Sequence, residues 1–76
     1  MFSKNIFSER VKHLRVTHNL MQKELAEIIN MSENTISMIE TKNRAASIEV
    51  IYAIADYFNV SIDYLVGRTD NPEVNK

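Results

Sequence analysis

Apolar residues recur along this chain at the three- and four-residue spacing that places side chains on one face of an α-helix. The spacing predicts helices over about 6–18, 22–29, 33–40 and 48–58, and a short helix over about 62–66. Met31 and Val60, in two of the connections, are expected to complete the core. We therefore expect an all-α fold in which these helices bury the following residues: Phe7, Val11, Leu14, Leu25, Ala26, Ile29, Ile36, Ile39, Ile48, Ile51, Ile54, Ala55, Phe58, Ile62, Leu65 and Val66.

Polar residues at the predicted boundaries support this division. Ser32, Ser47 and Ser61 stand where a hydroxyl accepts a hydrogen bond from the first turn of the following helix. Asn19 and Asn30 follow the first two helices and suit the left-handed conformation that ends many helices. The predicted helices 22–29 and 33–40 are therefore joined by a tight turn.

Composition limits the classes of protein that this chain can represent. Its 76 residues suffice for one small domain, and they include no cysteine, which excludes disulfides and thiolate metal sites. The sequence has neither a signal peptide's apolar region nor the roughly 18 apolar residues that span a bilayer. A paired base and nucleophile, a phosphate loop and a set of metal ligands are also absent from the sequence. We expect a cytoplasmic protein that is not an enzyme and has no cofactor, membrane contact or evident small-molecule ligand.

The chain ends in a polar stretch after Gly67. The sequence TDNPEVNK contains the chain's single proline and only one apolar residue. We therefore expect a domain over residues 1–68 and a flexible tail over 69–76.

Charge is divided unevenly along the chain. Residues 1–23 carry five Lys or Arg and one Glu, a net charge of +4, whereas residues 24–76 carry four basic and nine acidic residues, a net charge of −5. The whole chain has a formal net charge of −1, so its sum gives no sign of a nucleic-acid partner. The division predicts a positive face near the N-terminus, unless the charges merely decorate solvated helix surfaces.

The predicted pair of short helices within residues 22–40 suggests a binding function. Two helices joined by a tight turn can present the second one to the major groove of DNA. The motifs RVKHLR, NLMQKELAEIINMSENTISMIETKNRAAS and IADYFNVSIDYLVG resemble the helix-turn-helix family of phage repressors and Cro, from about Phe7 to Gly67. The resemblance implies a compact five-helix domain, binding to double-stranded operator DNA and a two-fold symmetric homodimer. It makes residues 33–40 the recognition helix.

Four residues on the outward face of the recognition helix are candidates for base contacts: Glu33, Asn34, Ser37 and Met38. An Asn pairs bidentately with adenine, and a Glu accepts from the amino group of cytosine. Met38 suits a thymine methyl group, and Ser37 a base edge or a phosphate. The alternative for Glu33 and Asn34 is a polar first turn that suits the helix dipole.

A second set of residues is expected to contact the DNA backbone. Gln22 opens the second predicted helix, where the resemblance implies a phosphate contact; a plain amide at a helix start is the alternative. For Thr35 the alternative is a local bond to Ser32, and for the loop after the recognition helix it is a solvated surface. The complete set is Gln22, Lys23, Thr35, Thr41, Lys42, Asn43 and Arg44.

Other polar residues are expected to serve the structure. Arg15 and Glu40 match positions that pair in related proteins, and such a pair would join the first helix to the recognition helix. Tyr57 and Tyr64 are candidates for a dimer contact, with ordinary amphipathic surface tyrosines as the alternative. His13 and His18 lack a third ligand, so we expect no metal site, and His18 suits the end of the first helix.

The sequence also departs from the family pattern. Met21 replaces the usual Ser or Thr cap, and the recognition helix carries Glu33 and Glu40 but no Lys or Arg. Two hypotheses therefore remain. The chain is a dimeric, sequence-specific transcriptional regulator, or it is an interaction module of the same fold, such as an antitoxin or a co-regulator, whose partner supplies DNA contacts.

Overall fold

The computed structural model describes residues 4–42 and 46–73. Within these ranges the regular secondary structure is helical and comprises five elements. They are α1 (Lys4–Thr17), α2 (Gln22–Ile28), α3 (Glu33–Lys42), α4 (Ile48–Phe58) and α5 (Ile62–Leu65). The all-α prediction is confirmed. The third helix runs two residues beyond its predicted end, to Lys42.

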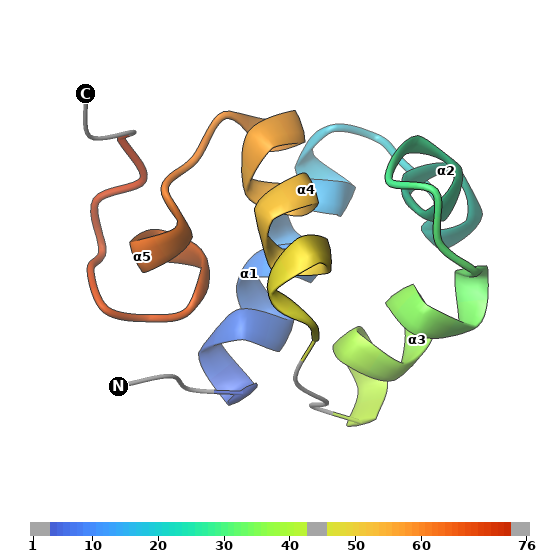
Figure 1. Ribbon diagram of the computed structural model, residues 1–76, viewed down its shortest axis with the longest axis horizontal. Helices are drawn as coiled ribbons and strands as arrows, with labels where there is room; N and C mark the ends of the chain where they lie inside the picture. The colour runs from blue at the N-terminus through green and yellow to red at the C-terminus, as the bar shows by residue number, and fades with distance from the viewer. Residues whose placement is uncertain (1–3, 43–45, 74–76) are drawn as a thin grey trace.

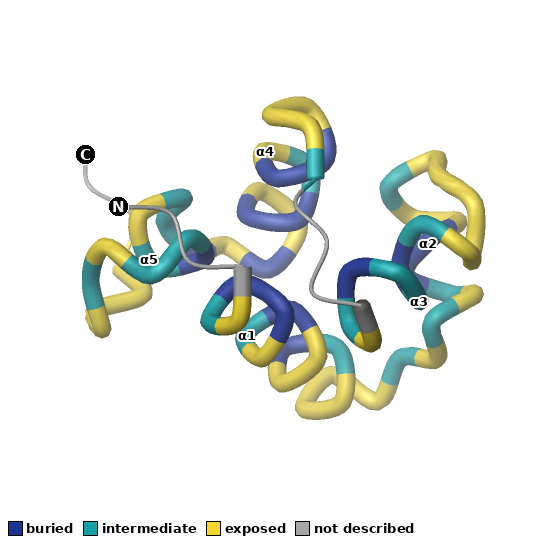
Figure 2. Tube along the Cα trace, turned by 90° about the horizontal axis from the view of Figure 1, so that it is seen from below, coloured by how far each residue is buried: buried dark blue, intermediate teal, exposed yellow. Residues whose placement is uncertain are grey.

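The helices form two groups around α1 and α4 (Figure 1). At one end of the molecule α2 and α3 pack against each other, and α3 also packs against α1. At the other end α5 packs against both α1 and α4. This arrangement leaves α2 and α3 together on one side, with α5 on the opposite side (Figures 1 and 2).

All five helices contribute to a single core, which explains how helices as short as α5 remain folded. The buried apolar residues are Phe7, Val11, Leu14, Leu25, Ala26, Ile36, Ile39, Val50, Ile51, Ile54, Ala55, Phe58, Val60 and Leu65. Figure 2 shows that the buried side of each helix faces the centre of the molecule. Burial at helical spacing confirms the amphipathic patterns read from the sequence.

Two predicted core residues are wrong. Ile48 is 67% exposed, and Val50 is buried in its place. At 3.6 residues per turn, Val50 lies about 40° around the helix from Ile54, whereas Ile48 lies about 120° away. Met31, in the turn before α3, is exposed as well. The rest of the predicted stripe on α4 is buried, so the apolar pattern identified the inward side of this helix and failed only in its first turn.

The predicted N-terminal caps are present. Ser47 accepts a hydrogen bond from the Val50 backbone N–H at 3.3 Å, and Ser61 accepts one from Tyr64 at 3.0 Å. Ser32 accepts from the backbone N–H of Thr35 at 3.2 Å. Each hydroxyl satisfies a backbone donor that a helix start leaves without a partner.

Left-handed residues end three of the helices or their last turns. Asn19 has φ 58° and Asn30 has φ 59°, as the sequence predicts, and Asn59 after α4 has φ 55°, which the sequence analysis missed. Asparagine tolerates this conformation because its short polar side chain bonds locally. Gly67, which follows the end of α5, also has a positive φ of 89°.

The described part of the C-terminal segment lies against the domain. The Arg10 guanidinium donates to the backbone oxygens of Tyr64 and Thr69 and pairs with Asp70 at 2.8 Å. The Ser61 backbone N–H donates to the carbonyl of Pro72 at 2.9 Å. Residues 69–73 therefore have contacts that the sequence did not suggest. The domain boundary at residue 68 and the mobility of residues 69–76 stay predictions.

Candidate nucleic-acid interface

The pair α2 and α3 forms a compact unit joined by residues 29–32. The Met31 backbone N–H donates to the Ala26 carbonyl at 2.8 Å, which closes the end of α2 around the left-handed Asn30. At its start, the Glu24 carboxylate accepts from the Met21 backbone N–H at 2.8 Å. The Glu24 bond satisfies one free donor near the start of α2, where the sequence lacks the usual hydroxyl cap.

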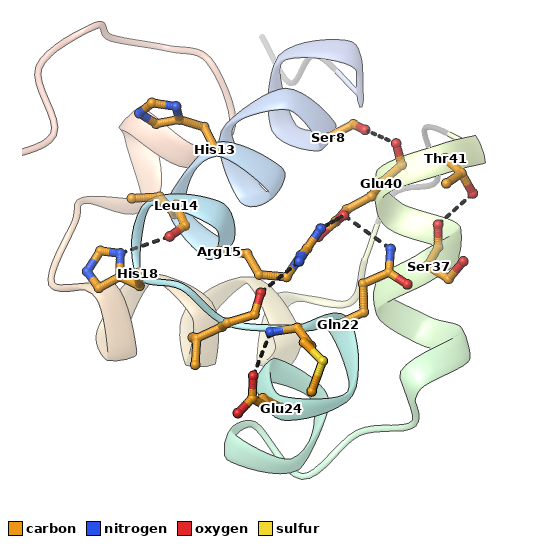
Figure 3. A network of polar contacts seen from close by, with 12 residues as sticks. Ser8, His13, Leu14, Arg15, His18, Gln22, Glu24, Ser37, Glu40 and Thr41 are labelled. Carbon is orange, nitrogen blue, oxygen red and sulfur yellow. Dashed lines mark hydrogen bonds and ion pairs between the residues drawn. The ribbon is translucent and has the colours of Figure 1, made fainter.

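An ion pair joins α1 to α3. Arg15 donates from Nε to Glu40 Oε2 at 2.7 Å and from Nη2 to Glu40 Oε1 at 2.9 Å, and the pair predicted from the sequence is thus present (Figure 3). The side chains are 13% and 1% exposed, respectively. Arg15 also donates to the Leu20 carbonyl at 2.7 Å. The guanidinium of Arg15, a residue of α1, therefore bonds both to α3 and to the connection that precedes α2.

The pKa of Arg15 is raised above its ordinary value, mainly by the hydrogen bond to Glu40. Burial lowers this pKa, and the negative charge of Glu40 raises it. Because the pKa is raised, the stabilisation of the folded protein by the charged Arg15 is complete at a pH below the pKa of the unfolded state. It is lost only as the pH rises through the pKa of the folded state. Arg15 is therefore charged throughout the neutral range, and its own titration contributes no pH dependence there.

Gln22 and Lys23 lie side by side in sequence at the start of α2, near the end of α3. Lys23 is exposed, and Gln22 is half-buried. The Gln22 amide donates from Nε2 to Glu40 Oε1 at 3.2 Å, a contact that the sequence analysis missed (Figure 3). Gln22 is thus joined to the ion pair, and Lys23 presents a cation to solvent close by.

The four candidate base-reading residues differ in exposure. Glu33 and Asn34, in the first turn of α3, are exposed, whereas Ser37 and Met38 are half-buried. The Asn34 amide donates from Nδ2 to Met38 Sδ at 3.3 Å. Sulfur is a weak acceptor and the amide has a second hydrogen, so this contact leaves Asn34 able to pair with a base edge.

Met38 also borders a hollow between α3 and the start of α4. The hollow has a volume of about 250 Å³ and is lined by Met31, Thr35, Met38, Ile39, Ala46, Ser47 and Val50. Met38 is thus one of the residues that line this hollow. A role in contacting a thymine methyl stays a prediction.

The two threonines expected at the DNA backbone have local partners. Thr35 Oγ1 lies 3.0 Å from Ser32 Oγ, which is the alternative that the sequence left open. Thr41 donates to the Ser37 carbonyl at 2.6 Å. Either hydroxyl oxygen can exchange its partner for a phosphate, but neither needs a ligand to be satisfied.

The loop after α3 is only partly covered by the structure. Lys42 is the last residue of α3. Asn43 and Arg44, also expected to contact the DNA backbone, lie outside the described residues. Their roles stay predictions from the sequence.

Of the two tyrosines expected at a dimer contact, Tyr57 lies near the end of α4 and Tyr64 lies in α5. Tyr57 is exposed, and its ring meets that of Phe58 edge-on at 5.0 Å between centroids. Tyr64 is half-buried, with the Arg10 guanidinium 4.2 Å from its ring centroid. Tyr57 therefore offers the more accessible surface for a second copy.

The His18 side chain has structural partners within the chain, whereas His13 takes part through its backbone carbonyl. His18 Nδ1 lies 2.8 Å from the Leu14 carbonyl at the end of α1, and its ring meets that of Phe58 at 4.8 Å. The His13 carbonyl accepts a hydrogen bond from the Thr17 hydroxyl. Within the described ranges, no group of three or more possible His, Cys, Asp or Glu ligands comes together.

The acidity of the recognition helix is smaller than its sequence suggests. Glu40 is buried beside Arg15, which neutralises it, so its charge does not add to that of the exposed Glu33. Of these two carboxylates, only that of Glu33 therefore presents its charge to solvent. Across the described residues, no helix is long and apolar enough to cross a membrane.

Comparison with known proteins supports the interpretation of α2 and α3 as a helix-turn-helix pair. A family model described as helix-turn-helix matches residues 11–65. The chain is 28% identical over 68 residues to YobD of Bacillus subtilis, an uncharacterized HTH-type transcriptional regulator, covering 90% of this chain. It is 39% identical over 63 residues to the antitoxin PezA of Streptococcus pneumoniae, covering 83% of this chain. It is 29% identical over 65 residues to the cryptic phage CTXphi transcriptional repressor RstR of Vibrio cholerae, covering 86% of this chain.

The chain belongs to the helix-turn-helix family, because the family model covers most of its length, including α2 and α3. The matches span 61% of YobD, 40% of PezA and 59% of RstR, so each of these relatives is considerably longer than the shared region.

Proposed function

We propose that this protein is a sequence-specific DNA-binding transcriptional regulator, a repressor of the phage or mobile-element type. The observation that carries the proposal is the exposed first turn of α3, with Asn34 free to read a base, beside Gln22 and Lys23 at the start of α2. A helix presented in this way enters the major groove while the preceding helix contacts the backbone. The relatives YobD and RstR, a regulator and a phage repressor, support the same assignment.

The proposal includes binding as a homodimer to double-stranded DNA. Two copies related by a two-fold axis read a pseudo-palindrome whose half-sites lie about 34 Å apart. The exposed Tyr57, near the end of α4, supports an interface in this part of the molecule, with Tyr64 beneath Arg10 as the second candidate. Such an interface must leave both copies of α3 free for the DNA.

The test is selection of bound duplexes from a random oligonucleotide pool by the purified chain. Recovery of a palindromic sequence supports both the reading of bases and the two-fold symmetry. A pool without enrichment contradicts the proposal. It favours the second candidate function, an antitoxin or co-regulator that needs a partner for DNA binding, which the similarity to PezA supports.

Asn34→Ala is expected to weaken binding to the selected sequence by about 5- to 150-fold, because a bidentate base contact contributes about 1–3 kcal/mol of discrimination. Binding to unrelated DNA is expected to stay unchanged. Fluorescence anisotropy with both duplexes measures the two affinities. An equal loss on both duplexes would show that Asn34 does not read a base.

Lys23→Ala is the matched control for Asn34, since both residues are exposed and near the proposed interface. Loss of one phosphate contact weakens binding to every sequence alike and reduces the log–log salt dependence by about 0.9. The two variants therefore separate base reading from backbone contact.

A further inference from the structure

Three side chains from different parts of the chain meet where α1, α2 and α3 converge. Glu40 Oε1 accepts from both Arg15 Nη2 at 2.9 Å and Gln22 Nε2 at 3.2 Å (Figure 3). An ion pair that served only to join α1 to α3 would need no third member. The additional bond connects the buried carboxylate to a residue proposed to contact DNA.

The chemistry of this bond determines how the Gln22 amide is turned. An ionised carboxylate can only accept hydrogen bonds, so the amide must present its nitrogen and not its oxygen to Glu40. The nitrogen carries two hydrogens, and the carboxylate takes one of them. The second hydrogen is left for another acceptor, and a phosphate oxygen is an acceptor of the same kind.

The position of Glu40 is itself closely determined. Its backbone carbonyl accepts a hydrogen bond at 2.9 Å from the hydroxyl of Ser8, a buried residue of α1 (Figure 3). Its side chain is 1% exposed, and its carboxylate accepts two hydrogen bonds from Arg15. The Arg15 charge cancels that of Glu40, so an approaching phosphate meets an oriented donor without an uncompensated negative charge beside it.

We propose that Glu40 is a positioning residue for DNA binding. It orients the Gln22 amide so that one nitrogen bridges the Glu40 carboxylate and a phosphate of the DNA backbone. This inference rests on the proposed function. It adds that the ion pair acts on affinity through Gln22, as well as on the stability of the fold.

The test measures whether Gln22 and the ion pair act together. The reference background replaces the pair by apolar residues of similar size, Arg15→Met and Glu40→Leu, an exchange that is often neutral or stabilising for a buried pair. Gln22→Ala is then compared in the wild type and in this background. Lys23→Ala is the control in both, because its exposed side chain is expected to act independently of Glu40.

Gln22→Ala is expected to weaken DNA binding about tenfold in the wild type, the effect of a hydrogen bond to a charged group. In the apolar background the same substitution is expected to change affinity less than about twofold. Lys23→Ala should cause equal losses in both. Equal losses from Gln22→Ala in both backgrounds would overturn the positioning role while leaving the proposed function intact.

A second measurement uses the wild type alone and does not depend on the folding of a variant. Gln22 is the only glutamine in the sequence, so its side-chain amide signals are readily assigned by NMR. In the free protein, one amide proton is expected to shift downfield; on addition of a DNA duplex, the second should shift while the first keeps its position. Loss of the first shift would overturn the bridge. Absence of DNA binding by the wild type would overturn both the bridge and the proposed function.

Discussion

Replacing Glu40 by alanine is expected to lower the free energy of unfolding by about 3 kcal/mol, because it removes one partner of a buried ion pair. The remaining Arg15 side chain is only 13% exposed, and its guanidinium would lose two of its hydrogen bonds. Most of this loss does not come from the attraction between the two charges. It arises because the substitution leaves the Arg15 charge buried without a compensating carboxylate. Urea denaturation followed by circular dichroism measures the change.

Glu33→Ala is the matched control for this prediction. Glu33 lies on the same helix, but its side chain is exposed, and substitutions at such positions usually change stability by less than about 0.5 kcal/mol. A similar loss from both variants would show that the Arg15–Glu40 pair contributes no more than a surface charge.

Leu25→Ala is expected to destabilise the protein by about 3 kcal/mol, because it leaves a cavity where α2 meets the core. Leu25 is completely buried and lies in the helix that supports α3. In a domain of this size such a loss is a large share of the total stability. The denaturation midpoint is expected to fall without a large change in the denaturant slope.

Ile28→Ala provides the comparison within the same helix. Ile28 is 42% exposed, so its substitution is expected to lower the free energy of unfolding far less than Leu25→Ala. Comparable losses would mean that α2 packs on a different face from the one that the structure shows.

Local sequence signals predicted most of the fold. The helical spacing of residues such as Phe7, Val11 and Leu14 identified a buried face, and the serine caps located the starts of the later helices. These signals succeed because they act over one or two turns of chain. Ile48 shows their limit, because an apolar residue in the first turn of a helix matches several possible faces and only packing selects one.

The candidate DNA surface was likewise only partly predictable. The sequence identified the helix pair and Asn34 as a polar residue of its first turn. From the sequence, Glu40 is both a negative charge on the proposed recognition helix and a partner of Arg15. In the structure its side chain is buried beside Arg15, so that its charge is compensated. Burial depends on residues 25 positions apart in the sequence, a relation that no local pattern contains.

The sequence by itself determined five amphipathic segments, their caps and turns, and the helix pair that identifies the family. Only the tertiary structure decided that Gln22 turns its nitrogen to Glu40 and that Arg10 holds the segment reaching Asp70. Helix formation is governed by neighbours within a few residues, whereas these contacts join groups 18 and 60 positions apart. These contacts form because packing of the core brings distant helices together. Their chemistry can therefore be inferred only from the folded structure.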